Sequence, residues 1–243
     1  MVVVLLAGVA AVFALSSGAQ EQAVVHAKLK VAPTTTTTVP KFQASTTLTS
    51  VVDELSAFEQ PDEASKVIST FSKSTEYKQP RTLLAVNTQP GWYQALLPMR
   101  PNSTTGWIRA ADVIPGESNF EIRISVSRHY LALLDHGEVV LEAQVAVGKP
   151  ETPTPLGKFY VTDPVDLTSR PNGAYGVFAL GLSAYSEVLK TFNGGPGQIA
   201  VHGNGQPDTI GKDVSNGCIR VVNDQILTIA HAVPLGTPVS IEA

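Results

Sequence analysis

The chain has 243 residues, with 17 lysines and arginines against 21 aspartates and glutamates, so its formal net charge is −4 when histidine is neutral. This balance provides no excess of basic residues, which argues against a nucleic-acid partner. An apolar share of 43% is typical of a globular protein, and the length is enough for one large or two smaller domains. The single cysteine, Cys218, excludes an internal disulfide. In an exported protein, such a cysteine indicates an intermolecular link or a reactive thiol.

The first 20 residues carry no charge, and residues 1–15 are an apolar run, MVVVLLAGVAAVFAL. The run is shorter than the ~20 apolar residues that span a bilayer, and no basic residue precedes it. A polar tract follows it, which argues against a buried core helix. We therefore expect residues 1–20 to be a signal peptide or a membrane anchor, with Met1 downstream of the true start. The protein is expected to be exported to the cell envelope.

Residues 21–48 are rich in threonine and proline, with five consecutive threonines between Pro33 and Pro40. Such a segment buries too little apolar surface to fold by itself. It is predicted to be an extended linker that lets the units after it reach away from a membrane surface.

Short β-prone runs separated by turn signals recur between residues 49 and 116, a pattern that predicts a small antiparallel β-barrel. Within it, GWYQALLP and TGWIRAADV together resemble bacterial SH3-like domains. The resemblance suggests that Trp92 and Trp107 line a peptide-binding groove. The alternative is packing in the core or between domains, since a tryptophan buries a large apolar area.

Residues 118–243 form the second predicted unit, which is mostly β with one or two short helices. Residues 120–148 alternate apolar and polar and include a hairpin turn at 135–137. One helix is predicted over 221–233, with Asn223 as its N-cap and Pro234 beyond its end. The polar segment from Asp163 to Tyr175 is long enough to act as a lid. Further strands are predicted at 157–163, 176–185, 197–203 and 238–243.

The stretch AVHGNGQPDTIGKDVSNGCIRV, residues 200–221, places the cysteine among glycine, asparagine and small polar residues. A structural cysteine instead behaves as a small hydrophobe. Cysteine attacks as its thiolate, which a nearby histidine or helix N-terminus favours. Cys218 precedes the predicted helix, and His202 follows an apolar strand whose end can hold a general base rigidly. This pattern predicts a nucleophile and its base, with an exposed sulfur and a lowered thiol pKa.

Neither a metal nor a cofactor is expected. One cysteine and one histidine supply two ligands, whereas zinc sites need three or four protein ligands, and Asp208 and Asp213 complete no common spacing. The remaining histidines are predicted to have structural or solvated roles. They are His26 in the linker, His129 on a strand, His136 in a turn and His231 on a helix face.

The motif VHGNGQPDTIGKDVSNGCIRV resembles the active-site signature of the L,D-transpeptidase (YkuD-like) catalytic domain. VAVGKPETPTPLGKFYV upstream, and the run from 176 into the histidine, resemble further family segments in the same order. The resemblance covers roughly residues 118–243 and implies a YkuD-like β-sandwich or barrel. It makes Cys218 the nucleophile and His202 its base, with Gly203 at the position whose main-chain carbonyl orients the histidine.

The resemblance also implies roles for the residues around the thiol. The N–H groups of Gly217 and Cys218 would form the oxyanion hole, and Ser215 would brace the loop. Arg220 would either bind a substrate carboxylate or lock the turn. Many family members have histidine where this chain has Asn216, which cannot titrate but can hydrogen-bond.

The implied reaction is peptidoglycan L,D-transpeptidation, in which a thioester at Cys218 releases D-Ala from a tetrapeptide stem and an amine then forms a 3→3 cross-link. Peptidoglycan stem peptides would be the partners and carbapenem-type β-lactams covalent inhibitors. Water or a free D-amino acid as acceptor would give an L,D-carboxypeptidase or an exchange enzyme. A non-catalytic cell-wall peptide-binding protein is a further alternative. A sortase-like enzyme is disfavoured, because the Thr-Leu-x-Thr-Cys motif is missing.

Overall fold

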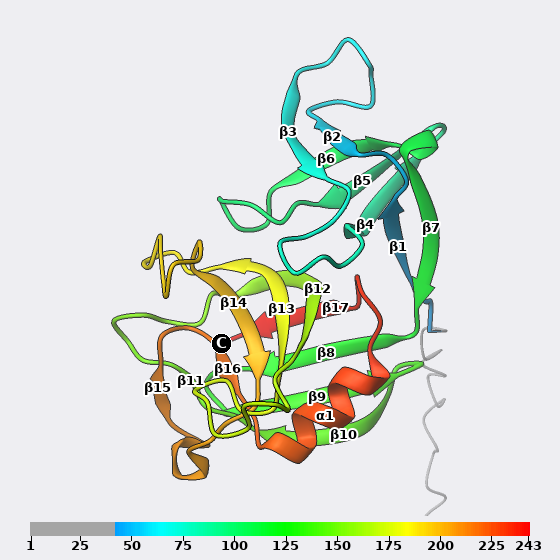
Figure 1. The fold of residues 1–243 in the computed structure, drawn as a ribbon. Helices are drawn as coiled ribbons and strands as arrows, with labels where there is room; N and C mark the ends of the chain where they lie inside the picture. Colours follow the sequence, from blue (N-terminus) through cyan, green and yellow to red (C-terminus); the bar gives the residue numbers. More distant parts are fainter. Residues whose placement is uncertain (1–41) are drawn as a thin grey trace, which may run out of the picture. The chain divides into compact units, whose positions relative to one another are not determined.

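The structure, a computed structural model, describes residues 42–243. The predicted signal or anchor at 1–20 and residues 21–41 of the predicted linker lie outside the described residues. In the described part the chain is mainly β, with a single α-helix (Figure 1). None of the helices among these residues has the length and apolarity needed to cross a membrane.

The first part of the described chain forms a seven-stranded antiparallel sheet, in the order β3-β2-β6-β5-β4-β1-β7. Its inner side chains, among them Leu48, Leu83 and Ile108, are fully buried in one hydrophobic cluster. Trp107 is buried and Trp92 is half-buried, so Trp107 belongs to the packing. The strands are β1 Ser45–Ser50, β2 Glu54–Phe58, β3 Val67–Ser72, β4 Thr82–Gln89, β5 Trp92–Leu96, β6 Thr105–Arg109 and β7 Val113–Ser118, with the 3₁₀ turn η1 at Ala110–Asp112.

β1 begins at Ser45, ahead of the predicted start of the first unit at residue 49. Its threonines favour extended backbone because they are β-branched. They also find a partner, because Thr46 pairs with Glu117 of β7 and Thr47 with Gly116. The last residues of the predicted linker are therefore part of a strand, which local composition could not indicate.

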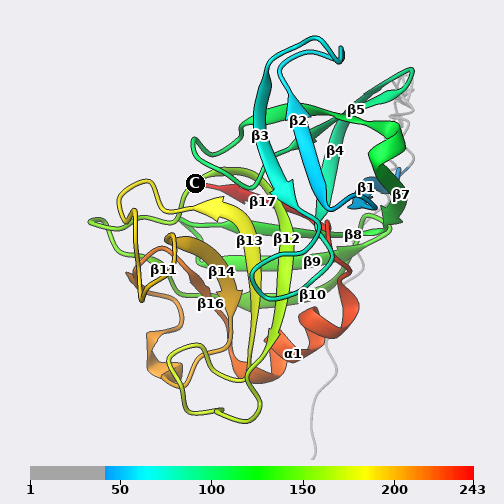
Figure 2. The same cartoon turned by 45° about the horizontal axis from the view of Figure 1, so that its top comes forward.

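The second sheet has eight strands in the order β10-β9-β8-β17-β12-β13-β14-β16 (Figures 1 and 2). The C-terminal strand β17 lies between β8 and β12, and β14 pairs with β16 in parallel. The strands are β8 Phe120–Ser125, β9 Tyr130–Asp135, β10 Glu138–Gln144, β12 Gly157–Asp166, β13 Phe178–Tyr185, β14 Gln198–His202, β16 Ile219–Arg220 and β17 Pro238–Glu242; β11 Val147–Gly148 pairs separately with β15 Asp213–Ser215, and η2 is Pro207–Thr209.

The only α-helix in the described residues, α1 (Asn223–Ala232), packs against this sheet through Ile226 and Ile229, which are fully buried. It ends before Pro234, as predicted, but Asn223 is not its N-cap. Val222 occupies that position, without a side-chain bond. The Asn223 Oδ1 instead accepts the N–H groups of Val177, at 3.3 Å, and Asn204, at 3.1 Å. The side chain therefore ties two loops together rather than capping the helix.

Two of the predicted histidine positions can be compared with the turns of this sheet. His136 lies in the β9–β10 hairpin turn, as predicted. The strand placement of His129 is wrong, because the residue lies in the β8–β9 turn with φ 50°. Its Nε2 is 2.7 Å from Asp213 Oδ1 on β15. This hydrogen bond joins the turn to the strand that leads into the cysteine loop.

Side chains also connect the two sheets, in both directions. Tyr160 of β12 is fully buried in the hydrophobic cluster of the first sheet. The Asn102 amide brackets Tyr185 at the end of β13, accepting its N–H at 2.9 Å and donating to its carbonyl at 2.8 Å. The β6 side of the first sheet is thereby connected to the β13–β14 loop that borders the candidate site.

Candidate active site

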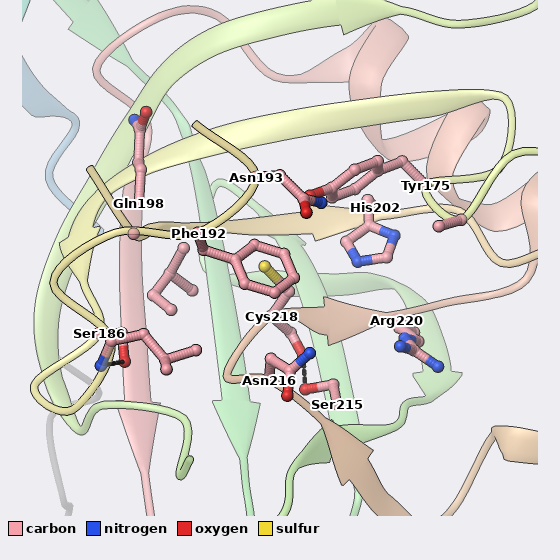
Figure 3. A pocket seen from close by; sticks show the side chains of 14 residues that line it. Tyr175, Ser186, Phe192, Asn193, Gln198, His202, Ser215, Asn216, Cys218 and Arg220 are labelled. Carbon is pink, nitrogen blue, oxygen red and sulfur yellow. Dashed lines mark hydrogen bonds between the residues drawn. The ribbon is translucent and has the colours of Figure 1, made fainter. Parts of the chain in front are cut away.

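The parallel pairing of β14 and β16 brings the predicted nucleophile and base together. Val201 pairs with Ile219 and His202 with Arg220, so Cys218, directly before β16, lies beside Ala200. The Ala200 N–H favours the charged form of the sulfur and so acts to lower its pKa. Cys218 and His202 line the same pocket, as Figure 3 shows. A strand end holds each of the two residues, which limits their relative motion.

The His202 ring is fixed by a backbone carbonyl. Its Nδ1 lies 2.6 Å from the carbonyl oxygen of Gly203. A carbonyl only accepts, so Nδ1 carries a hydrogen and Nε2 is the available base. The Tyr175 ring packs edge-on against the imidazole with 4.8 Å between centroids. Only 3% of His202 is exposed, and this burial lowers its pKa to about 4, with the Gly203 bond opposing the shift and the Arg220 charge adding to it.

The thiol differs from the sequence-based expectation. Burial raises the pKa of Cys218 above its usual value, against the opposing effects of the Ala200 N–H and the Arg220 charge. This direction is opposite to the lowered pKa that the sequence predicts, although Cys218 as a whole is half-buried and lines a pocket. With a neutral imidazole and a protonated thiol, the resting pair is uncharged.

The buried neutral imidazole predicts a pH-dependent stability. The His202 pKa is near the ordinary imidazole value of 6.5 in the unfolded chain and about 4 in the folded chain, so between these values the unfolded state binds more protons. The stabilisation is complete above pH 6.5 and is lost as the pH falls through about 4, an effect of about 3 kcal/mol. Urea unfolding at pH 7 and pH 4 measures it. We expect His202→Gln to remove this part of the pH dependence and His231→Gln, at an exposed position on α1, to keep it. Equal pH dependence in wild type and His202→Gln would contradict the assignment.

The loop before the cysteine is braced by Ser215, whose hydroxyl donates to the Cys218 carbonyl at 2.6 Å and accepts the Gly217 N–H at 3.1 Å. Gly217 has φ 113°, a conformation that L side chains rarely adopt. Because the Gly217 N–H is already bonded, the predicted two-donor oxyanion hole is not open in this structure. Of the two predicted donors, Cys218 N–H remains.

Two buried threonines hold this loop from the β11–β12 connection. The Thr154 hydroxyl accepts the Gly148 N–H and donates to the Gly217 carbonyl, both at 2.9 Å. Thr152 donates to the Ser215 carbonyl at 3.2 Å. Both threonines lie in the segment VAVGKPETPTPLGKFYV, whose sequence predicts no role for either of them. Their spacing alone does not show that they contact residues 63 positions further along the chain.

Two cavities meet at Cys218. One, of about 70 Å³, is lined by both predicted catalytic residues and by Ser215, Asn216 and Arg220. The other, of about 340 Å³, extends to Glu76 and Tyr77 in the β3–β4 connection of the first sheet. Gly203 and Gly217 line neither cavity but position the residues that do. Lining residues that the sequence analysis did not single out for the site include Ser186, Phe192, Asn193 and Gln198.

Arg220 is the cation of the smaller cavity. Its backbone N–H donates to the Ala146 carbonyl at 2.9 Å, which fixes the strand. Its side-chain Nε is buried and has no hydrogen-bond partner within residues 42–243. A buried donor without an acceptor is costly, so the guanidinium is suited to a ligand oxygen. Asn216 is exposed at the rim.

Tyr175 reaches the pocket from the segment predicted as a lid. The first residues of that segment, 163–166, belong to β12 instead. Tyr175 covers His202 from the remaining loop. Within residues 42–243 no group of three or more His, Cys, Asp and Glu side chains has a metal-binding arrangement.

In this geometry a cysteine and a histidine, whose ring is oriented by a backbone carbonyl, line one pocket at the edge of a β-sheet. Comparison with known proteins identifies a family for the chain. The family model described as the L,D-transpeptidase catalytic domain, YkuD, matches residues 119–241. A Bacillus licheniformis protein named as a YkuD L,D-transpeptidase is 35% identical over 155 residues, covering 61% of this chain and 85% of the relative. Its Bacillus subtilis counterpart is 33% identical over 153 residues, covering 60% and 84%. The chain belongs to the YkuD L,D-transpeptidase family.

Solved structures with detectable similarity include an L,D-transpeptidase from Mycobacterium tuberculosis. It is 15% identical, with a TM-score of 0.43 over 67% of this chain and 90% of that one. L,D-transpeptidase 3 from the same organism, in complex with a faropenem-derived adduct, has a TM-score of 0.42 at 14% identity, over 67% and 91%.

Proposed function

We propose that the protein is a peptidoglycan L,D-transpeptidase that forms 3→3 cross-links through a thioester at Cys218. The observation that carries the proposal is the shared pocket of Cys218 and His202, with Nδ1 of the histidine bonded to Gly203 and Nε2 available as a base. Family membership gives the reaction class. The mechanism follows from the two neutral groups.

In the first half-reaction, the Cys218 sulfur attacks the carbonyl carbon of the third stem residue while its proton passes to His202 Nε2. The carbonyl oxygen becomes an oxyanion, which the Cys218 N–H stabilises. The C–N bond to D-Ala then breaks, and the imidazolium returns its proton to the departing amine. A thioester remains, and the histidine is again neutral. Because His202 is buried, the charge it acquires is transient.

In the second half-reaction, an amine attacks the thioester carbonyl and His202 takes a proton from it. His202 returns this proton to the sulfur as the C–S bond breaks, so the thiol and the neutral histidine are both regenerated. We assign the donor stem to the smaller cavity, where Arg220 is the cation of the lining and suits a stem carboxylate. The acceptor is assigned to the larger cavity, where Glu76 is the acidic residue of the lining and suits a cationic amine.

Export to the cell envelope belongs to the same proposal, since peptidoglycan is the substrate. Carbapenem-type β-lactams acylate Cys218 in this proposal, because they present an activated carbonyl to the same nucleophile. For the first sheet we propose an SH3-like domain. Its half-buried Trp92, together with Arg109 and Glu63, lines a surface cavity that is suited to a peptide.

The test is mass spectrometry of residues 42–243 incubated with disaccharide-tetrapeptide fragments, with Cys218→Ala in parallel. We expect an acyl-enzyme, release of D-Ala and a cross-linked dimer, all absent from the variant. D-Ala release without a dimer would replace the proposal with the carboxypeptidase reaction, and incorporation of added D-amino acid would indicate exchange. Folded wild-type protein that forms no acyl-enzyme would instead favour the non-catalytic peptide-binding protein.

A further inference from the structure

The connection between β13 and β14, residues 186–197, forms a loop that borders the thiol. At its base the Ser186 N–H donates to the Gly197 carbonyl at 2.8 Å. At its tip Phe192 and Gly195 exchange two backbone hydrogen bonds, at 3.0 and 2.9 Å. Phe192 and Asn193, also at the tip, line both cavities that meet at Cys218 (Figure 3). The position of this loop therefore shapes the space in which a substrate contacts the sulfur.

One side chain from the first sheet holds both limbs of that loop. The Arg100 guanidinium donates to the Ser186 carbonyl from Nε at 3.3 Å and from Nη2 at 3.0 Å. Nη2 also approaches the carbonyls of Leu189 at 3.1 Å and Pro196 at 2.9 Å. The guanidinium lies over the Tyr185 ring, 4.9 Å from its centroid. Carbonyls from the beginning and the end of the loop thus share one cation.

The contact requires the geometry of arginine. A planar guanidinium can stack on a ring while its N–H groups point at several acceptors, whereas a lysine ammonium is a compact charge without a planar fork. The loop is also shaped to fit. Gly197 has φ 70°, and a Cβ there would lie 2.2 Å from the Leu189 carbonyl oxygen and 3.1 Å from Arg100 Nη2. The beginning and the end of the loop are therefore packed closely together, and the Arg100 guanidinium bridges their carbonyls.

We infer that Arg100 is a positioning residue for the active site, which fixes the 186–197 loop so that Phe192 and Asn193 shape the substrate pocket. Arg100 lies in the connection between β5 and β6 of the first sheet, outside the 119–241 range of the family model. The role therefore comes from the first sheet and not from the matched domain. The inference makes the first sheet part of the substrate site, in addition to the peptide-binding role proposed for that sheet. Its consequence for turnover rests on the proposed function, but its consequence for the loop does not.

The experiment compares Arg100→Ala and Arg100→Lys with Arg128→Ala and Arg128→Lys. Arg128 is a matched control, because it also stacks on a tyrosine, at 5.3 Å from the Tyr130 ring, and donates to Ser125, yet it lines neither cavity at Cys218. Amide hydrogen exchange of residues 187–197 reports the loop directly. Steady-state kinetics with the tetrapeptide report the pocket, and iodoacetamide alkylation reports access to the thiol.

We expect both Arg100 variants, and neither Arg128 variant, to raise exchange in the loop about tenfold or more while β8 and β9 stay protected. The KM for the tetrapeptide should rise about tenfold with a smaller change in kcat, and alkylation of Cys218 should not slow. Unchanged exchange and unchanged KM in Arg100→Ala would overturn the inference. If wild-type protein does not turn over the fragment, the proposed function fails, while the exchange comparison still decides the role of Arg100.

Discussion

Replacing His202 by glutamine is expected to slow acylation of Cys218 by about 10²–10⁴-fold, the usual contribution of a general base. Glutamine can still donate a hydrogen bond toward the Gly203 carbonyl, so the local geometry has a substitute, but it cannot accept the thiol proton. The thiol has no compensating route, because burial raises its pKa and little thiolate forms spontaneously. The rate of acyl-enzyme formation, followed by mass spectrometry, measures the loss.

The pH profile identifies the mechanism behind that loss. His202 must be neutral to act, and its pKa is lowered to about 4, so the wild-type acylation rate should be level at neutral pH and fall as the pH drops through about 4. His202→Gln should show no such acid limb. A preformed thiolate–imidazolium pair would instead lose activity when the histidine deprotonates, near neutral pH. A loss of activity as the pH rises through neutrality would therefore argue against the neutral pair.

The pairing of Cys218 with His202 was predictable because the signature around them is local and specific. The strands were predictable where side chains alternate, as in the run that forms β8, β9 and β10. The chemical state of the thiol was not predictable. A loop rich in glycine and asparagine indicates exposure, but Cys218 is half-buried, because elements outside the local sequence line the pocket around it. Tyr175 and Phe192, from two separate connections, line the pocket around it.

The start of helix α1 is a second feature that local sequence did not predict correctly. Asparagine at the head of an apolar run is a good N-cap by propensity. In the fold, two backbone N–H groups from distant loops compete for the Asn223 oxygen and take it. Arg100 is a longer-range case, since its carbonyl partners lie 86–96 residues away. Partners at such separations follow from the topology, which sequence pattern alone does not define.

Changing Thr154 to valine is expected to lower the free energy of unfolding by about 2–6 kcal/mol. Valine fills nearly the same volume but leaves the buried Gly148 N–H and Gly217 carbonyl without their shared partner, at about 1–3 kcal/mol for each group. Gly148 cannot easily move to relieve the loss, because a Cβ there would lie 2.4 Å from the Thr152 carbonyl oxygen and the chain is already in close contact. Urea unfolding with an unchanged m-value measures the effect.

Thr154→Ser is the matched control for this prediction, since it keeps the hydroxyl and removes one methyl group. Its cost should be about 1 kcal/mol, the value of a lost buried methyl. Equal destabilisation by serine and valine would show that Thr154 contributes packing rather than hydrogen bonds. If the hydroxyl is the important group, only valine should also slow acylation, because the Gly217 carbonyl that it releases lies one peptide unit from Cys218. Stability and reactivity then change together, since the threonine that holds the core of the loop also sets the orientation of the nucleophile.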